Sequence, residues 1–275
     1  MPAVDAEIEG YARLAEELRQ PRYLWVTPFL KGSRALSEGR FEECAQLARQ
    51  AMAIGQRAQD PTAPLMFETL INVLRMVQGQ VEDREQAILR YIENFPEIPS
   101  MRATLANLYF RLGRREDAQR EFDQVAAHDF ATLPRDTSWV VTMANLAYVC
   151  SYINDVRRAA ILYDQLLPYA PRQCVIGGAA IGTGSILRFL GILATTLSRW
   201  EDAVAHFEGA LLMNARIGAI PFGALTQQEY GAMLLKRGEP GDREKAHQIL
   251  DQALAIGKEI GMQGLIRDVN ALKSQ

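Results

Sequence analysis

The stretch "LGILATTLSRWEDAVAHFEGAL", residues 190–211, has the pattern of two amphipathic helices joined by a tight turn. Its first half carries the small residues Gly191 and Ala194, and its second half carries Ala203 and Phe207. Residues four apart lie on one face of a helix, so Ala203 and Phe207 face the same way. The small residues allow two helix backbones to approach closely, and the aromatic ring fills the space beside them. The stretch therefore predicts an antiparallel helix pair.

The same pattern recurs along the chain. It is clear in "LANLYFRLGRREDAQREFDQV" (105–125) and "LAYVCSYINDVRRAAILYDQLLPYAP" (146–171), and weaker around Gly39, Gly79 and the turn "RGEPGD" (237–242). Glycine or asparagine at the turn is typical of the left-handed conformation that ends a helix. One anchor position begins the core of each second helix, and successive anchors are 34 to 44 residues apart in the sequence. These anchors are Cys44, Arg84, Ala118, Ala159, Ala203 and Ala246.

The repeat predicts an all-α fold, because no long alternation of β-branched residues indicates strands. We expect one domain over residues 1–275, built as a right-handed superhelical solenoid of antiparallel helix pairs. The pairs are expected at 22–60, 61–98, 99–133, 136–171, 174–216 and 221–258, with flanking helices at 4–20 and 262–273.

These repeats resemble the tetratricopeptide (TPR) repeat, whose period is 34 residues. The longer steps, and segments such as "EGRFEECAQLARQAMAIGQRAQDP" (38–61), are similar to the C-terminal TPR regions of bacterial signalling ATPases. That group includes maltose-regulator-like transcription activators and ATPase-linked adenylate or guanylate cyclases. The resemblance runs from about Val4 to Met262, and the N-terminal end looks cut rather than capped. It implies a non-catalytic scaffold for protein–protein or intramolecular interactions in signalling or transcription regulation.

Composition excludes several functional classes. Of 275 residues, 48% are hydrophobic and 23% are charged, and 33 acidic side chains against 30 basic ones give a net charge of −3. A protein that binds nucleic acid directly usually has a basic face, and here the basic residues are spread along the chain. Three cysteines without a CxxC motif indicate reduced thiols, and "MPAVDAEIEG" has no signal-peptide pattern. We therefore expect a cytoplasmic protein.

The stretch "CVIGGAAIGTGSILRF" (174–189) holds four glycines. A phosphate-binding P-loop would need lysine and then serine or threonine where Thr183 and Gly184 stand. A membrane span is disfavoured by the small polar residues and by Arg188. We expect residues from Val175 onward to extend the first helix of the fifth pair. Four helical glycines would cost about 0.8–1 kcal/mol each relative to alanine, which indicates a close neighbour: a packed helix, or alternatively a ligand.

The sequence offers no catalytic constellation. His128, His206 and His247 fall in different repeats and share no metal-ligand spacing, and we expect them to be exposed or partly packed. Nothing resembles a nucleophile elbow or a Cys–His pair. We therefore predict a protein that is not an enzyme and that uses no cofactor or metal.

The concave surface, lined by the first helix of each pair, is the expected binding site. Its mixture of aromatic, amide and basic side chains suits a protein or peptide partner, or an ATPase or cyclase module of the same parent chain. The alternative is a sensor for a small molecule, which a compact pocket near Tyr148, Tyr152 and Arg188 would favour. The candidate binding residues are Asn107, Phe110, Arg111, Asn145, Tyr148, Tyr152, Arg188 and Gln228.

Chaperone-binding TPR proteins hold a C-terminal carboxylate with two asparagines and three basic residues. Asn107 and Asn145 fall at the two asparagine positions of that pattern, whereas Ala103, Ser185 and Phe189 stand at the basic ones. Without cations such a clamp cannot hold an acidic tail tightly. We therefore exclude chaperone-tail binding and expect the two asparagines to bond backbone groups.

Overall fold

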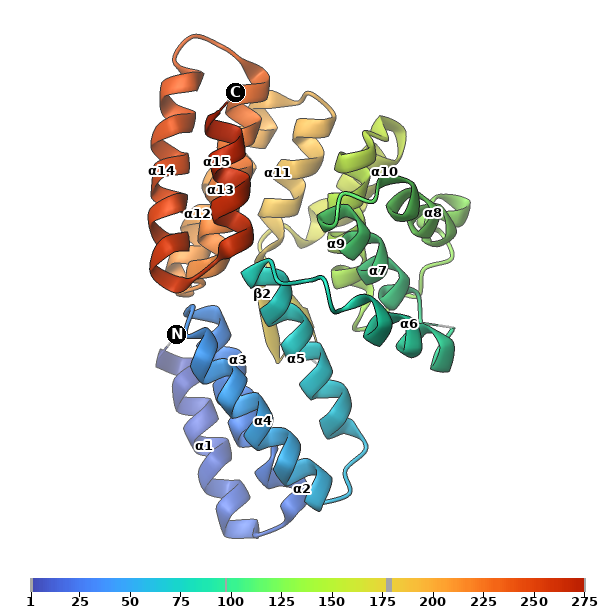
Figure 1. The fold of residues 1–275 in the computed structure, drawn as a ribbon, viewed down its shortest axis with the longest axis vertical. Helices are drawn as coiled ribbons and strands as arrows, with labels where there is room; N and C mark the ends of the chain where they lie inside the picture. Colours follow the sequence, from blue (N-terminus) through green and yellow to red (C-terminus); the bar gives the residue numbers. More distant parts are fainter. Residues whose placement is uncertain (1, 97, 177–179, 275) are drawn as a thin grey trace.

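The computed structural model describes residues 2–96, 98–176 and 180–274 and is helical except for one short hairpin (Figure 1). The expected all-α class is confirmed. The chain begins with α1 (Pro2–Leu18) and the short α2 (Pro21–Leu24), and it ends with α15 (Gln263–Lys273). Between them come α3 (Val26–Ser37), α4 (Phe41–Arg57), α5 (Thr62–Gln78), α6 (Glu85–Asn94), α7 (Pro99–Arg111), α8 (Arg115–Val125), α9 (Trp139–Ile153), α10 (Val156–Leu166), α11 (Ile186–Thr196), α12 (Trp200–Arg216), α13 (Ile220–Arg237) and α14 (Asp242–Ile260). Two 3-10 turns, Ala127–Phe130 and Leu167–Tyr169, follow α8 and α10, and the hairpin consists of β1 (Gln173–Ile176) and β2 (Ile181–Ser185).

The turns inside the pairs adopt the backbone conformation that the repeat predicts. Gly39, Gly113 and Asn154 follow α3, α7 and α9 with φ angles of 78°, 71° and 61°. This left-handed conformation lets the chain reverse within a few residues and provides bonds for the last carbonyl groups of the helix. Each first helix can therefore fold back against its partner.

Small residues set the spacing inside the pairs, as expected. A Cβ atom added to Gly191 of α11 would lie 2.8 Å from the ring of Phe207 in α12. One added to Gly231 of α13 would lie 2.6 Å from Leu250 in α14. Ala203, the anchor of α12, is completely buried. A larger side chain at these positions would force the two helices apart.

The second predicted range, 61–98, is less regular than the others. It contains α5 and α6, which are separated by residues 79–84. Helix α6 packs against α7, the first helix of the next pair.

The expectation that the glycine-rich stretch extends the first helix of the fifth pair is wrong. Val175 and Ile176 do not extend a helix: they lie in β1, which pairs antiparallel with β2, and α11 begins only at Ile186. The hydroxyl of Ser185 caps α11 by accepting a hydrogen bond from the backbone N–H of Leu187 at 3.2 Å. The hairpin avoids the cost of placing several glycines inside a helix. Gly177, Gly178 and Ala179 lie outside the described residues.

A neighbouring helix does lie close to one of these glycines. Gly184 has a φ angle of 92°, and a Cβ atom added to it would lie 2.8 Å from the Cβ atom of Phe222 in α13. Beside it, the Oδ1 atom of Asn214 accepts the backbone N–H of Ser185 at 3.1 Å. The amide of Asn214 also donates to the hydroxyl of Thr226 at 3.2 Å. These buried bonds fix β2 to α12 and α13.

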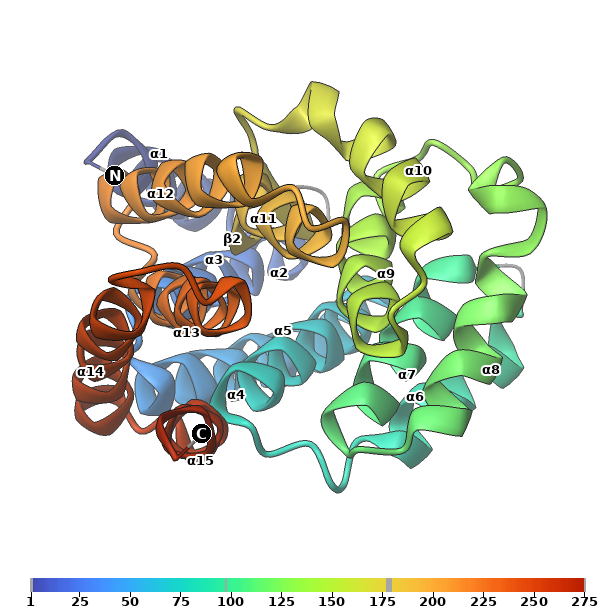
Figure 2. The same cartoon turned by 90° about the horizontal axis from the view of Figure 1, so that it is seen from above.

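The arc of helices returns upon itself (Figure 2). Helix α13 contacts α3, and α15 contacts α5, so the last helices share a core with the first ones. The hairpin strengthens this junction, because the hydroxyl of Ser33 in α3 donates to the carbonyl of Ala180 at 2.5 Å. Two glycines meet where α15 joins the end of α5: a Cβ atom added to Gly264 would lie 2.8 Å from the Cα atom of Gly79. We call this contact the closure contact.

None of the described helices is long and apolar enough to cross a membrane.

Substituting Gly79 tests the closure contact. Gly79→Ala places a methyl group against the backbone of Gly264, whereas Gly113→Ala, with a similar φ angle of 71°, meets nothing within 4 Å. Both variants should lose about 1–2 kcal/mol from left-handed strain. Gly79→Ala should lose a further 1–3 kcal/mol, about the usual cost of overpacking. Urea denaturation of the two variants measures the difference, and equal losses would show that the closure contact is not tight.

Candidate binding site

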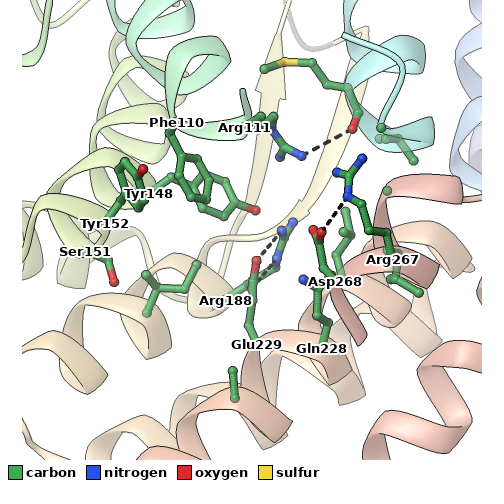
Figure 3. Close-up of a pocket in the computed structure, with 18 of the residues that line it drawn as sticks. Phe110, Arg111, Tyr148, Ser151, Tyr152, Arg188, Gln228, Glu229, Arg267 and Asp268 are labelled. Carbon is green, nitrogen blue, oxygen red and sulfur yellow. Dashed lines mark hydrogen bonds and ion pairs between the residues drawn. The ribbon is translucent and has the colours of Figure 1, made fainter. Parts of the chain in front are cut away.

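The closed arc surrounds a cavity of about 720 Å³ (Figure 3). Its lining comes from the ends of α5, α7 and α9, from α11 and α13, and from the first turns of α15. These are the first helices of successive pairs, together with the last helix of the chain. The cavity is therefore bounded by segments that are far apart in the sequence.

Six of the eight candidate residues line this cavity. They are Phe110, Arg111, Tyr148, Tyr152, Arg188 and Gln228. The other two lie between α7 and α9, where the amide of Asn107 donates to the Oδ1 atom of Asn145 at 2.7 Å. Asn145 in turn donates to the hydroxyl of Thr104 at 3.3 Å. The expectation that the two asparagines bond backbone groups is wrong for these contacts, because their partners are side chains: each other, Thr104 and Arg111.

Aromatic side chains form one wall of the cavity. Phe110 stacks on Tyr148, with ring centroids 6.0 Å apart and an angle of 20° between the planes. The rings of Phe110 and Tyr152 are 5.0 Å apart. Behind this wall, Phe189 meets Tyr148 edge to face at 5.6 Å. Rings held in this way form a stiff apolar surface with one exposed polar group on each tyrosine.

A buried ion pair lies beside the aromatic wall. Arg188, at the start of α11, makes two hydrogen bonds of 2.7 Å to the carboxylate of Glu229 in α13. The two side chains are only 3% and 17% exposed. Such a two-pronged pair fixes the orientation of both helices. Glu229 is a residue that we did not select from the sequence, although it is the single acidic residue of α13 and so carried a signal.

Burial shifts the pKa values of these groups. It raises the pKa of Glu229 and lowers that of Arg188, and the attraction between the two charges opposes both changes. Burial also lowers the pKa of Arg111, against the attraction of Glu229 and Asp268. Because the guanidinium group starts from a very high pKa, both arginines stay charged at neutral pH.

Arg111 has neutral hydrogen-bond partners. Its Nη1 atom donates to the carbonyl of Met76 at 3.4 Å, and its Nε atom donates to the Oδ1 atom of Asn107 at 3.3 Å. The guanidinium carbons of Arg111 and Arg188 lie 5.6 and 5.3 Å from the centroid of the Tyr148 ring. Two cations thus interact with one aromatic ring.

The remaining charged groups lie toward solvent. Arg267 and Asp268, on α15, are exposed and form an ion pair of 3.2 Å with each other. Lys236, near the end of α13, is also exposed. Figure 3 shows the ends of Arg267 and Asp268 directed toward those of Arg111 and Arg188. The sequence predicts only a flanking helix at 262–273, so the contribution of α15 to the cavity was missed.

The described residues give no support for metal or thiol chemistry. No group of three or more His, Cys, Asp or Glu among them could hold a metal ion. The three cysteines are free and buried. Burial raises the pKa of Cys174 to about 11, which disfavours the reactive thiolate.

His206 is partly packed, as expected. Its Nε2 atom lies 2.8 Å from the hydroxyl of Tyr163 in α10. Burial lowers the pKa of His206, because the charged imidazolium would lose its hydration. The contact therefore joins two neighbouring helix pairs through a neutral histidine.

No protein-family model and no curated protein matches the sequence. The geometry of the cavity is thus the basis on which a function is proposed.

The ion pair predicts a particular pattern of stability. Glu229→Ala leaves the charge of Arg188 buried without its partner and should cost about 3 kcal/mol or more. The double variant Arg188→Met with Glu229→Leu fills the space with apolar groups and should recover most of that loss. Urea denaturation measures both. If the double variant were as unstable as Glu229→Ala, the loss would come from disturbed packing between α11 and α13 and not from an unpaired buried charge.

His206 predicts a dependence of stability on pH. Since folding lowers its pKa, the unfolded chain binds a proton more readily, and stability should fall as the pH drops below the ordinary value of 6.5. His206→Gln keeps an acceptor near Tyr163 but does not titrate. The free energy of unfolding of the wild type should therefore fall relative to His206→Gln between pH 6.5 and pH 5. Parallel curves over this range would contradict the assignment.

Proposed function

We propose that this chain is a non-catalytic sensor domain that binds a small molecule in the cavity inside the arc. The observation that carries the proposal is the cavity itself, whose volume of about 720 Å³ lies within the range of small-molecule sites. An aromatic wall and a few converging polar groups are also typical of such sites.

A small molecule fits this geometry better than a protein or peptide partner, which we had favoured from the sequence. A peptide helix needs a long open groove along the first helices. Here α13 and α15 contact α3 and α5, so the first helices line a partly open pocket bounded at both ends of the arc and not a long open groove. Peptide binding would require the closure contact between Gly79 and Gly264 to open.

The proposal includes a cellular setting. We propose a TPR-like right-handed solenoid that belongs to a bacterial cytoplasmic signalling or transcription-regulatory protein and acts on an ATPase or cyclase module of the same parent chain. The recurring left-handed turns and the small residues between paired helices support it. The partner set includes neither nucleic acid nor membrane, in keeping with the acidic balance of the chain.

A mechanism follows from where the cavity lies. A ligand inside it touches α7 and α9 on one side and α13 and α15 on the other. It therefore changes the free energy difference between closed and open arrangements of the arc by its differential affinity for the two. A partner module that contacts α15 would respond to the change in its position when the ligand binds.

Filling the cavity tests the proposal. Ala232→Trp projects an indole from α13 into the cavity, and the matched control Ala205→Trp places it on the exposed face of α12. Thermal unfolding against a library of metabolites should identify compounds that raise the Tm of the wild type and of Ala205→Trp by several degrees. Those compounds should have no effect on Ala232→Trp. Equal shifts in both variants, or no shift with any compound, would contradict the proposal.

A further inference from the structure

The guanidinium of Arg111, which lines the cavity, has no ion-pair partner among the described residues. Among the charged groups lining the cavity, Arg188 is bound by Glu229, and Arg267 is bound by Asp268. Arg111 and Lys236 form no ion pair with any carboxylate that the structure describes, and of the two Lys236 is exposed to solvent. A guanidinium has five N–H donors, so Arg111 retains unused donors that neighbouring groups do not satisfy.

The two hydrogen bonds of Arg111 are weak ones. At 3.3 and 3.4 Å they are longer than the usual 2.7–3.2 Å, and both acceptors are neutral. Burial lowers the pKa of Arg111, and the attraction of Glu229 and Asp268 offsets that change only in part. An anion at this position would restore the missing charge-assisted bonds.

The surroundings of Arg111 favour an anion over a cation. The charged side chains lining the cavity include four basic ones and three acidic ones. Two of each are paired with one another, which leaves the cations Arg111 and Lys236 against the single carboxylate of Glu82. Arg188 adds a second positive charge against the same Tyr148 ring. A cationic ligand would face both guanidinium groups at close range.

The aromatic wall determines the rest of the ligand. The ring of Tyr148 lies beside Arg111, and Phe110 and Tyr152 continue the aromatic wall from it (Figure 3). An inorganic anion alone would leave this apolar surface uncovered. A flat apolar body attached to the anionic group would cover it and stack on the rings.

We infer that the cavity selects a planar apolar molecule bearing an anionic group, held by Arg111 and stacked on Phe110, Tyr148 and Tyr152. This inference rests on the proposed function, since it names the ligand class of the same cavity. The anionic group is a carboxylate or a phosphate, and both accept the two-pronged bonds that a guanidinium offers.

A displacement experiment tests the inference. The neutral dye N-phenyl-1-naphthylamine, which brightens in apolar sites, reports occupancy of the cavity. The competitors share one ring system and differ in their polar group: 1-naphthoate, 1-naphthyl phosphate and the neutral 1-naphthamide. With the wild type, at least one anion should displace the dye at a concentration tenfold or more below that of the amide, because a charge-assisted bond is worth about that factor. The stronger of the two anions identifies the anionic group.

Variants assign this preference to Arg111. Arg111→Gln should abolish it, and Lys236→Gln, which removes one exposed positive charge from the same cavity, should preserve it. If Arg111→Gln is unfolded by circular dichroism, Arg111→Met replaces it, because methionine keeps the apolar stem. A preference that survives loss of Arg111, or an amide that competes as well as both anions, overturns the inference.

The failure of the proposed function has a different signature. Dye that does not bind the wild type, or that binds Ala232→Trp equally well, would show that the cavity takes no small molecule. Dye binding that Ala232→Trp abolishes, without a preference for anions, would leave the proposed function standing and overturn the inference alone.

Discussion

The contact between the two ends of the helix arc is the constraint on which the rest of the structure depends. Where Gly79 meets Gly264, the backbones come so close that no side chain fits between them. That approach brings α15 to the end of α5 and α13 to α3, and it turns the concave side of a row of helices into a partly open cavity. Without it, Arg111 and the aromatic wall would face open solvent, where a charge interacts weakly and stacking adds little.

Much of the helical framework could be predicted from the sequence, because the information there is local. Small residues opposite an aromatic or aliphatic one, as with Gly191 and Phe207, define a helix pair within about twenty residues. The hairpin could not be predicted in this way, since its support comes from Phe222 and Asn214, which follow it in the chain, and from Ser33, which precedes it by far. The four glycines indicate only that a helix or a ligand packs close to this stretch, and not which one.

In the candidate site, too, local sequence predicts some features and contacts between distant residues determine the others. Residues from the first helices could be assigned by register, because each pair repeats the same geometry, and six of the eight line the cavity. Glu229, Arg267 and Asp268 were missed, since their roles depend on how distant pairs meet. The bond between Arg188 and Glu229 joins residues 41 positions apart, in two helices whose relative rotation no local pattern specifies. Register predicts which residues face inward, and tertiary packing decides which of them meet.

The hairpin has a consequence for how the molecule comes apart. In an open row of repeats each unit contacts only its neighbours, so unfolding can begin at one end and proceed unit by unit. Here β2, in the middle of the chain, contacts α3 near the start and α13 near the end. Helix α3 cannot separate from the hairpin without breaking the bond from Ser33 to Ala180, and α13 cannot separate without exposing the contact between Phe222 and Gly184. The chain is thus joined as a closed ring and not as an open row, so we expect its two halves to unfold together.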